Sequence, residues 1–281
     1  MSGAEHSAVT IALSKKEMKE HQTPDMDALF QDMSNRPIII EAYPIQEEPT
    51  DTPGYTEVCT KRVHLIRHGQ GFHNMLADSY RSEGKSWDQF VSDSRNPYVV
   101  PEVTDAPLTN KGRLQASALQ PSARDMSPPV ELVVVSPQCR ATQTGLIAFR
   151  HLLEGGGGGG KKVFVAHENV REESGVHVCD QRRSISNARF EFPQVDWTGI
   201  ESDDDPIFKA DKRESKAEVG ERIYDFLMWL REREEGTVAV ASHSGWLMTL
   251  FSGVCVSKEE LKPWFQTGEM RSVKLVWKKR D

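Results

Sequence analysis

The chain has 281 residues, of which 37% are hydrophobic and 27% charged, an ordinary composition for a soluble protein that can bury a sizeable core. Its net charge of −7 argues against general binding to nucleic acid or to anionic membranes, so we expect neither as a partner. No apolar run reaches the roughly 18–20 residues that a membrane-spanning helix needs.

The start of the chain does not have the pattern of a targeting signal. Glu5 precedes the short apolar patch near the N-terminus, and no apolar region follows a basic start. The four cysteines are widely spaced and form no CxxC pair, which favours free thiols in a reducing compartment. We therefore expect a cytoplasmic protein.

Residues 1–60 have the pattern of an N-terminal extension. Their sequence predicts a short helix at 25–33 and an extended stretch at 36–45. Residues 46–57 are rich in Glu, Pro and Thr and have few apolar side chains, which is typical of a linker. We expect one domain to follow, from residue 61 to residue 281.

Strands and helices alternate from Arg62 onward. Apolar or β-branched runs predict strands at 62–69, 130–137 and 237–245, and helical patterns lie between them at 109–119, 140–155 and 215–236. In the last helix, five apolar residues share one face: Val219, Ile223, Phe226, Leu227 and Leu230. The basic run at 271–280 is a candidate edge strand. This order predicts an α/β fold, a three-layer α/β/α arrangement with a mostly parallel, doubly wound sheet.

A run of six glycines at 155–160 resembles a phosphate-binding loop only superficially. Lys162 stands where such a loop needs Ser or Thr, and the run precedes a strand instead of following one. We interpret it as a surface loop.

Polar residues follow three of the predicted strands. The first strand ends at Arg67 and His68, the second is followed by Arg140, and a late strand ends at His243 and Ser244. Because the carboxyl ends of parallel strands meet at one edge of a sheet, we expect these side chains to form one site.

The residue types at this edge suit phosphate chemistry. Two guanidinium groups can bind phosphate oxygens, and a neutral imidazole can attack phosphorus to form a phosphoramidate. A second, protonated imidazole can stabilise the developing charge, and Gly69 and Gly71 would let backbone amides approach the anion. Glu172 and Glu173 are the candidates for the acid that protonates the leaving oxygen.

Four motifs resemble the histidine phosphatase superfamily, the phosphoglycerate mutase-like fold. They are LIRHGQGFHN, DAPLTNKGRLQA, VVVSPQCRATQT and VASHSGWL, in the family's order between residues 62 and 250. The resemblance implies a small phosphorylated substrate and no cofactor. It also implies roles for individual residues, namely His68 as nucleophile, Arg67 and Arg140 as phosphate clamp, His243 as second histidine and Asn74 as phosphate contact. Gly69 and Ser244 would line the anion site, and Glu172 is preferred to Glu173 as acid.

The stretch GVHVCDQRRSIS resembles a plant and fungal branch of phosphoglycerate mutase-like proteins. It lies in a segment around 176–214 that we interpret as an inserted cap. Arg182 and Arg183 either contact a second anionic group of the substrate or form a solvated basic turn. The acidic stretch at 201–206 fits a solvated loop better than a metal site.

Other hydrolase classes do not fit. A cysteine phosphatase needs an Arg where Gly145 follows Cys139, a zinc hydrolase needs a histidine cluster, and a serine hydrolase needs a Gly where Ser242 stands. We expect a metal-independent phosphatase. A phosphomutase and a non-catalytic phospho-ligand binder stay as alternatives, and the substrate class and oligomeric state stay open.

Overall fold

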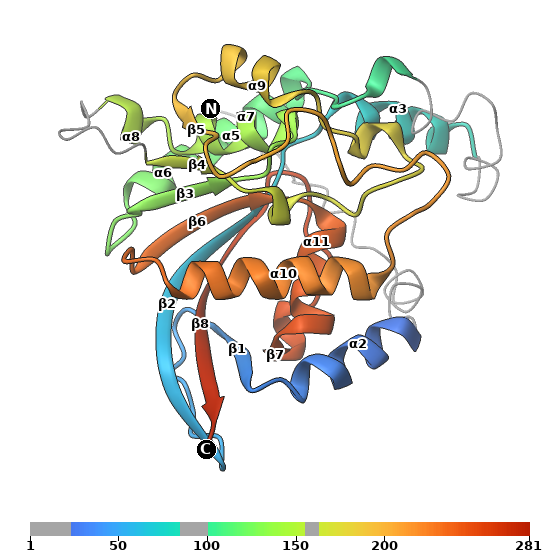
Figure 1. Cartoon of the computed structure of the whole chain (residues 1–281). Coiled ribbons are helices and arrows are strands. Elements are labelled where there is room, and N and C mark those ends of the chain that lie inside the picture. Colours follow the sequence, from blue (N-terminus) through green and yellow to red (C-terminus); the bar gives the residue numbers. More distant parts are fainter. Residues whose placement is uncertain (1–23, 85–100, 155–162) are drawn as a thin grey trace, which may run out of the picture.

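The computed structural model describes residues 24–84, 101–154 and 163–281 (Figure 1). Its strands form one eight-stranded sheet with the order β5-β4-β3-β6-β2-β8-β1-β7. The strands are β1 (Ile38–Pro44), β2 (Tyr55–Arg67), β3 (Leu132–Val135), β4 (Phe164–Ala166), β5 (Val195–Asp196), β6 (Thr237–Ser242), β7 (Val256–Ser257) and β8 (Met270–Arg280). Only the pairs that β8 makes with β2 and β1 are antiparallel, so the mostly parallel sheet is confirmed in the described part.

Helices cover both faces of this sheet. The α-helices are α2 (Pro24–Ser34), α3 (Phe72–Ser82), α5 (Asn110–Ala118), α6 (Gln120–Arg124), α7 (Cys139–Ala148), α8 (His151–Glu154), α9 (Ile185–Glu191), α10 (Lys216–Arg231) and α11 (Ser244–Thr249). Short 3-10 segments are η1 (Pro101–Val103), η2 (Glu168–Val170), η3 (Val178–Asp180) and η5 (Glu259–Leu261), and a π-helical segment, η4 (Leu250–Val254), follows α11.

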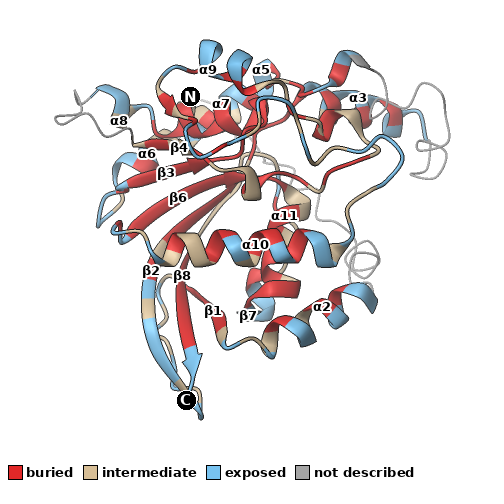
Figure 2. Ribbon diagram, viewed as in Figure 1, coloured by how far each residue is buried: buried red, intermediate tan, exposed pale blue. Residues whose placement is uncertain are grey.

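Alternating side chains of the central strands divide the core into two layers. In β3, Leu132 and Val134 pack with α2, α10 and α11, whereas Val133 and Val135 pack with α7 and α9 on the other face. Strands β3 and β6 are buried along their whole length, and Figure 2 shows them as buried between the helices. The three-layer α/β/α arrangement is therefore confirmed.

Helix α10 forms as its sequence pattern predicts. Ser215 and Glu218 form a reciprocal capping box at its start. The five apolar residues predicted to share one face, Val219, Ile223, Phe226, Leu227 and Leu230, are all buried. Each buried side chain of this kind contributes roughly 1.5–3 kcal/mol relative to an exposed one, so this face fixes α10 against the sheet.

The described part of the expected extension belongs to the sheet and its core. Strand β1 lies between β8 and β7, and Met26, Leu29 and Met33 of α2 are buried. Leu29 fits because Gly220 and Gly253 leave room for it, since a Cβ on either glycine would collide with its side chain. Residues 24–60 are thus not a separate extension, and the expected boundary at 60/61 falls inside β2.

Strand β8 is not an edge strand, so that expectation was wrong. Strand β8 lies between β2 and β1. Its outer side pairs with β1, which belongs to the residues that were expected to form an extension. The edges of the described sheet are β5 and β7. The segment 176–214, expected as an inserted cap, contributes η3, α9 and the edge strand β5.

No helix within residues 24–84, 101–154 and 163–281 is long and apolar enough to cross a membrane. The glycine run at 155–160, interpreted above as a surface loop, lies outside the described residues.

Candidate active site

The structure brings the three predicted strand ends together because β2, β6 and β3 are neighbours in the sheet. The His68 amide donates to Ser242 O at 3.0 Å, which aligns the end of β2 with the end of β6. The ring centroids of His68 and His243 are 5.0 Å apart. Arg140 reaches the same point from the first turn of α7, which follows β3. These residues form one cluster at the carboxyl edge of the sheet.

Two hydrogen bonds define the tautomer of His68. Its Nδ1–H donates to Gly69 O at 2.7 Å, and its Nε2 accepts from Arg140 Nε at 3.2 Å. Nε2 therefore carries the lone pair. Burial, together with the charges of Arg140 and Arg67, holds the pKa of His68 well below its usual value. The geometry and the electrostatics both present a neutral, nucleophilic Nε2.

Arg140 is almost completely buried, and all three of its nitrogens donate. Nε faces His68, Nη1 donates to Cys179 O at 2.6 Å, and Nη2 forms an ion pair with Asp180 at 3.0 Å. The second predicted clamp residue, Arg67, donates from Nη1 to Phe265 O at 2.7 Å and lies over the ring of Trp264. Arg140 is thus directed at His68, whereas Arg67 contacts the loop before β8.

His243 directly precedes α11, and its Nε2 is 2.8 Å from Ser136 Oγ. In the described part of the chain its Nδ1 is buried without a hydrogen-bond partner. Burial and the nearby Arg140 hold the pKa of His243 well below its usual value. The protonated form expected from the sequence therefore needs a bound anion, which would favour the imidazolium.

A third histidine, His73, was missed by the sequence analysis. Its ring centroid lies 5.7 Å from that of His68, and its side chain is buried. Burial, Arg140 and His68 hold the pKa of His73 well below its usual value. The sequence signal was available, because His73 stands beside Asn74 in the same motif as His68.

The two candidate acids have different surroundings. Glu172 is buried at the start of α11, where its carboxylate accepts from the amides of Gly245 and Trp246, each at 3.1 Å, and from Ser244 Oγ at 3.3 Å. Glu173 instead forms ion pairs with Arg213 and Lys216. Glu172 and His243 thus meet at the same helix start, while Glu173 is held by cations.

The amides of Gly69 and Gly71 bond to side chains of the protein itself. Gly69 N donates to Thr144 Oγ1 at 3.0 Å, and Gly71 N donates to Asn74 Oδ1 at 3.0 Å. A Cβ on Gly69 would collide with the backbone carbonyl of Gly112 in α5. Gly69 is therefore required for close packing between two backbones, and the side chain of Asn74 caps the start of α3.

Arg182 is buried inside a network of ion pairs and cannot be a solvated turn residue. Its Nε donates to both oxygens of Glu168, at 3.0 and 3.2 Å. Its Nη1 and Nη2 donate to backbone carbonyls, those of Arg183, Ser202, Asp203 and Asp204. These bonds use all five N–H groups of Arg182, so none is left for the substrate anion that the sequence suggested as one of its two roles. Its function is to hold the 202–204 loop in place.

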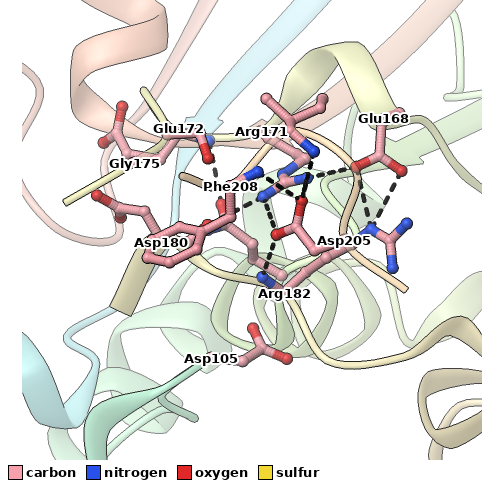
Figure 3. Close-up of polar contacts among 12 residues, drawn as sticks. Asp105, Glu168, Arg171, Glu172, Gly175, Asp180, Arg182, Asp205 and Phe208 are labelled. Atoms are coloured by element: carbon pink, nitrogen blue, oxygen red, sulfur yellow. Dashed lines mark hydrogen bonds and ion pairs between the residues drawn. The ribbon is translucent and has the colours of Figure 1, made fainter. Parts of the chain in front are cut away.

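Figure 3 shows how this network continues. Arg171 binds Asp205 through two nitrogens, at 2.8 and 2.6 Å, and shares Glu168 with Arg182. Arg183, expected as a second anion contact, pairs with Asp105 at 2.7 Å and with Glu191. The arginines of this motif therefore bind acidic side chains of the protein, because the segment would otherwise bury unpaired charge.

The described residues contain no group of three or more His, Cys, Asp or Glu side chains arranged to hold a metal ion. The positive charge of the cluster comes from Arg140 and Arg67, whose charges both act on His68.

Comparisons with known proteins match the chain to one family. Residues 95–280 match the model of the histidine phosphatase superfamily (branch 1). A phosphoglycerate mutase-like protein of Arabidopsis thaliana is 33% identical over 243 residues, covering 77% of this chain and 84% of that protein. An ecdysteroid-phosphate phosphatase of Drosophila melanogaster is 27% identical over 250 residues, covering 78% of this chain and 31% of its own length. A putative α-ribazole-5′-P phosphatase of Escherichia coli aligns in structure over 76% of this chain and 90% of its own, with a TM-score of 0.45 and 18% identity.

Proposed function

Because the chain belongs to the histidine phosphatase superfamily, we propose that it hydrolyses a phosphomonoester through a phosphohistidine intermediate on His68. The observation that carries this proposal is the tautomer of His68. Its Nδ1–H is committed to Gly69 O, so the lone pair on Nε2 is available where Arg140 can bind a phosphate oxygen.

The proposed reaction has two steps. In the first, Nε2 of His68 attacks phosphorus, the phosphorus–oxygen ester bond breaks, and the leaving oxygen takes a proton from Glu172. In the second, water attacks phosphorus and gives a proton to the Glu172 carboxylate, and the phosphorus–nitrogen bond breaks. Arg140, Arg67 and His243 would stabilise the negative charge on the other phosphate oxygens, so the proposed reaction requires no metal ion.

Glu172 is the acid in this proposal, because its carboxylate lies at the helix start that follows His243. Glu173 is a poorer candidate, because its carboxylate is held in ion pairs with Arg213 and Lys216. The substrate would be a small phosphorylated molecule.

A phosphomutase is the second candidate, and the name of the Arabidopsis relative favours it. Both reactions would use the same phosphohistidine. They differ in the acceptor, which is water in a phosphatase and a hydroxyl group of the substrate in a mutase.

Incubating the purified full chain with a panel of phosphomonoesters tests the proposal. A phosphatase releases inorganic phosphate in equal amount to the dephosphorylated product. A mutase yields an isomeric phosphate ester with little free phosphate, and a pure binding protein leaves every ester unchanged.

A further inference from the structure

Asp180 is a buried carboxylate that bridges two arginines. Its Oδ1 accepts from Arg140 Nη2 at 3.0 Å, and its Oδ2 accepts from Arg213 Nη1 at 2.7 Å. Its side chain is only 5% exposed. Burial alone would raise the pKa of this carboxyl, but Arg213 and Arg140 hold it below its usual value, so Asp180 is ionised.

The contact with Asp180 determines how the Arg140 guanidinium is oriented. One nitrogen of Arg140 faces His68, and the other two bind Cys179 O and Asp180. A planar guanidinium held at two nitrogens has little freedom to rotate, so the third nitrogen stays directed at Nε2 of His68.

The backbone and the second partner of Asp180 are also held in place by hydrogen bonds. The backbone carbonyl of Asp180 accepts from Gln138 Nε2 at 2.8 Å and from Arg171 Nη2 at 3.1 Å. On the other side, Arg213 also donates to Gly175 O at 2.8 Å. Asp180 therefore lies between the phosphate-binding arginine and the loop that leads into α10.

We propose that Asp180 is a positioning residue, which fixes Arg140 for phosphate binding at His68 and does not itself touch the substrate. This inference rests on the proposed function, because it assigns Arg140 to phosphate. It also assigns a role to the Cys-Asp-x-Arg-Arg stretch at residues 179–183. In this role the aspartate positions Arg140, whereas the sequence had suggested that the arginines contact the substrate.

The direct test is the affinity of the full chain for inorganic phosphate, measured by calorimetry, in the wild type and in Asp180→Asn. We expect binding to weaken about 10- to 100-fold, the loss typical when the partner that orients a metal-binding side chain is removed. Glu41→Gln is the matched control, because Glu41 is also a buried carboxylate in an ion pair, with Lys278 at 2.7 Å in the β1–β8 region. This control should bind phosphate like the wild type even if it is less stable.

A double-mutant cycle separates positioning from a general structural role. If Asp180 acts only through Arg140, then Asp180→Asn should cause no further loss of phosphate affinity in the Arg140→Ala background. If Asp180→Asn alone fails to fold, the double variant Asp180→Asn/Arg213→Gln removes one charge of each sign and should show the same weakening.

Three outcomes distinguish this inference from the proposed function. The positioning role alone is overturned if Asp180→Asn binds phosphate within twofold of the wild type. It is also overturned if Asp180→Asn lowers phosphate affinity as much in the Arg140→Ala background as in the wild type. Weakened binding in a protein that hydrolyses no ester overturns the phosphatase proposal and supports the positioning role. A wild-type chain that neither binds phosphate nor hydrolyses esters overturns both.

Discussion

Nε of Arg140 lies 3.2 Å from Nε2 of His68 and donates a hydrogen bond to it. A guanidinium can donate to this nitrogen only while the imidazole is neutral there, so the pair fixes the protonation state of the proposed nucleophile. When phosphate binds, Nε of Arg140 can donate to a phosphate oxygen instead of to Nε2 of His68. The proposed reaction therefore depends on the Arg140–His68 pair.

The first prediction concerns metal ions. Since Arg140, Arg67 and His243 are proposed to carry the charge stabilisation, hydrolysis of p-nitrophenyl phosphate should be unchanged after treatment with EDTA and gel filtration. Activity that is lost with EDTA and restored by magnesium contradicts this account, because the metal would then be part of the catalytic machinery.

The second prediction separates Glu172 from Glu173. Replacing the proposed acid in Glu172→Gln should lower kcat about 10²- to 10⁴-fold for esters with poor leaving groups, and much less for p-nitrophenyl phosphate, whose leaving group needs little protonation. Glu173→Gln is the matched control and should show no such difference between substrates. A larger and leaving-group-dependent loss in Glu173→Gln would assign the acid to the other residue.

The third prediction uses the space beside Glu172. A Cβ on Gly245 would lie 2.5 Å from Glu172 Oε1, so Gly245→Ala should displace the carboxylate from the start of α11. We expect kcat for esters with poor leaving groups to fall about 10-fold, together with a loss of about 1–3 kcal/mol in unfolding free energy. Gly199→Ala is the control, because nothing lies within 4 Å of the added atom. Wild-type turnover in Gly245→Ala would show that the position of Glu172 does not matter.

The fourth prediction is that the three buried histidines of the site contribute to a pH dependence of stability. The pKa values of His68, His73 and His243 are all held well below the usual value of about 6.5, mainly by burial. Below pH 6.5 the unfolded chain binds these protons and the folded chain does not, so the free energy of unfolding falls as pH falls. Each such group contributes about 1.4 kcal/mol per pH unit until its folded pKa is reached.

Melting temperatures between pH 7 and pH 5, with and without inorganic phosphate, measure this dependence. The loss on acidification should be smaller with phosphate bound, because the anion favours the imidazolium forms. The variant His68→Asn should have a shallower pH dependence than the wild type. Equal melting temperatures at pH 7 and pH 5 without phosphate would contradict the pKa directions on which this prediction depends.

The sequence could predict the central part of the site because the relevant signals are local. His68, Arg140 and His243 each follow a run of β-branched or apolar residues, and parallel strands place such positions at one edge. The buried face of α10 was predictable for the same reason, because the spacing of its apolar residues can be read within a single helix.

The surroundings of the site depend on contacts between distant segments. The burial of Arg182 is caused by Glu168 and by the 202–204 loop, and the charge of Asp180 is balanced by Arg213, which lies 33 residues later in the chain. Likewise, β1 belongs to the sheet because β8 returns to pair with it, which no local pattern reveals. A single motif shows which residue types are present, but the residues that they contact from distant parts of the chain are determined by the complete fold.

The most direct test of the central claim is to trap the phosphorylated enzyme. Rapid quench of the full chain with a labelled phosphomonoester should yield a protein adduct that is stable in alkali and labile in acid, as expected of a phosphoramidate. His68→Ala should lose both adduct and turnover, and His243→Ala should keep an adduct while turnover falls about 10²- to 10³-fold. An adduct that persists in His68→Ala and disappears in His243→Ala would contradict the account, because the nucleophile would then be the other histidine.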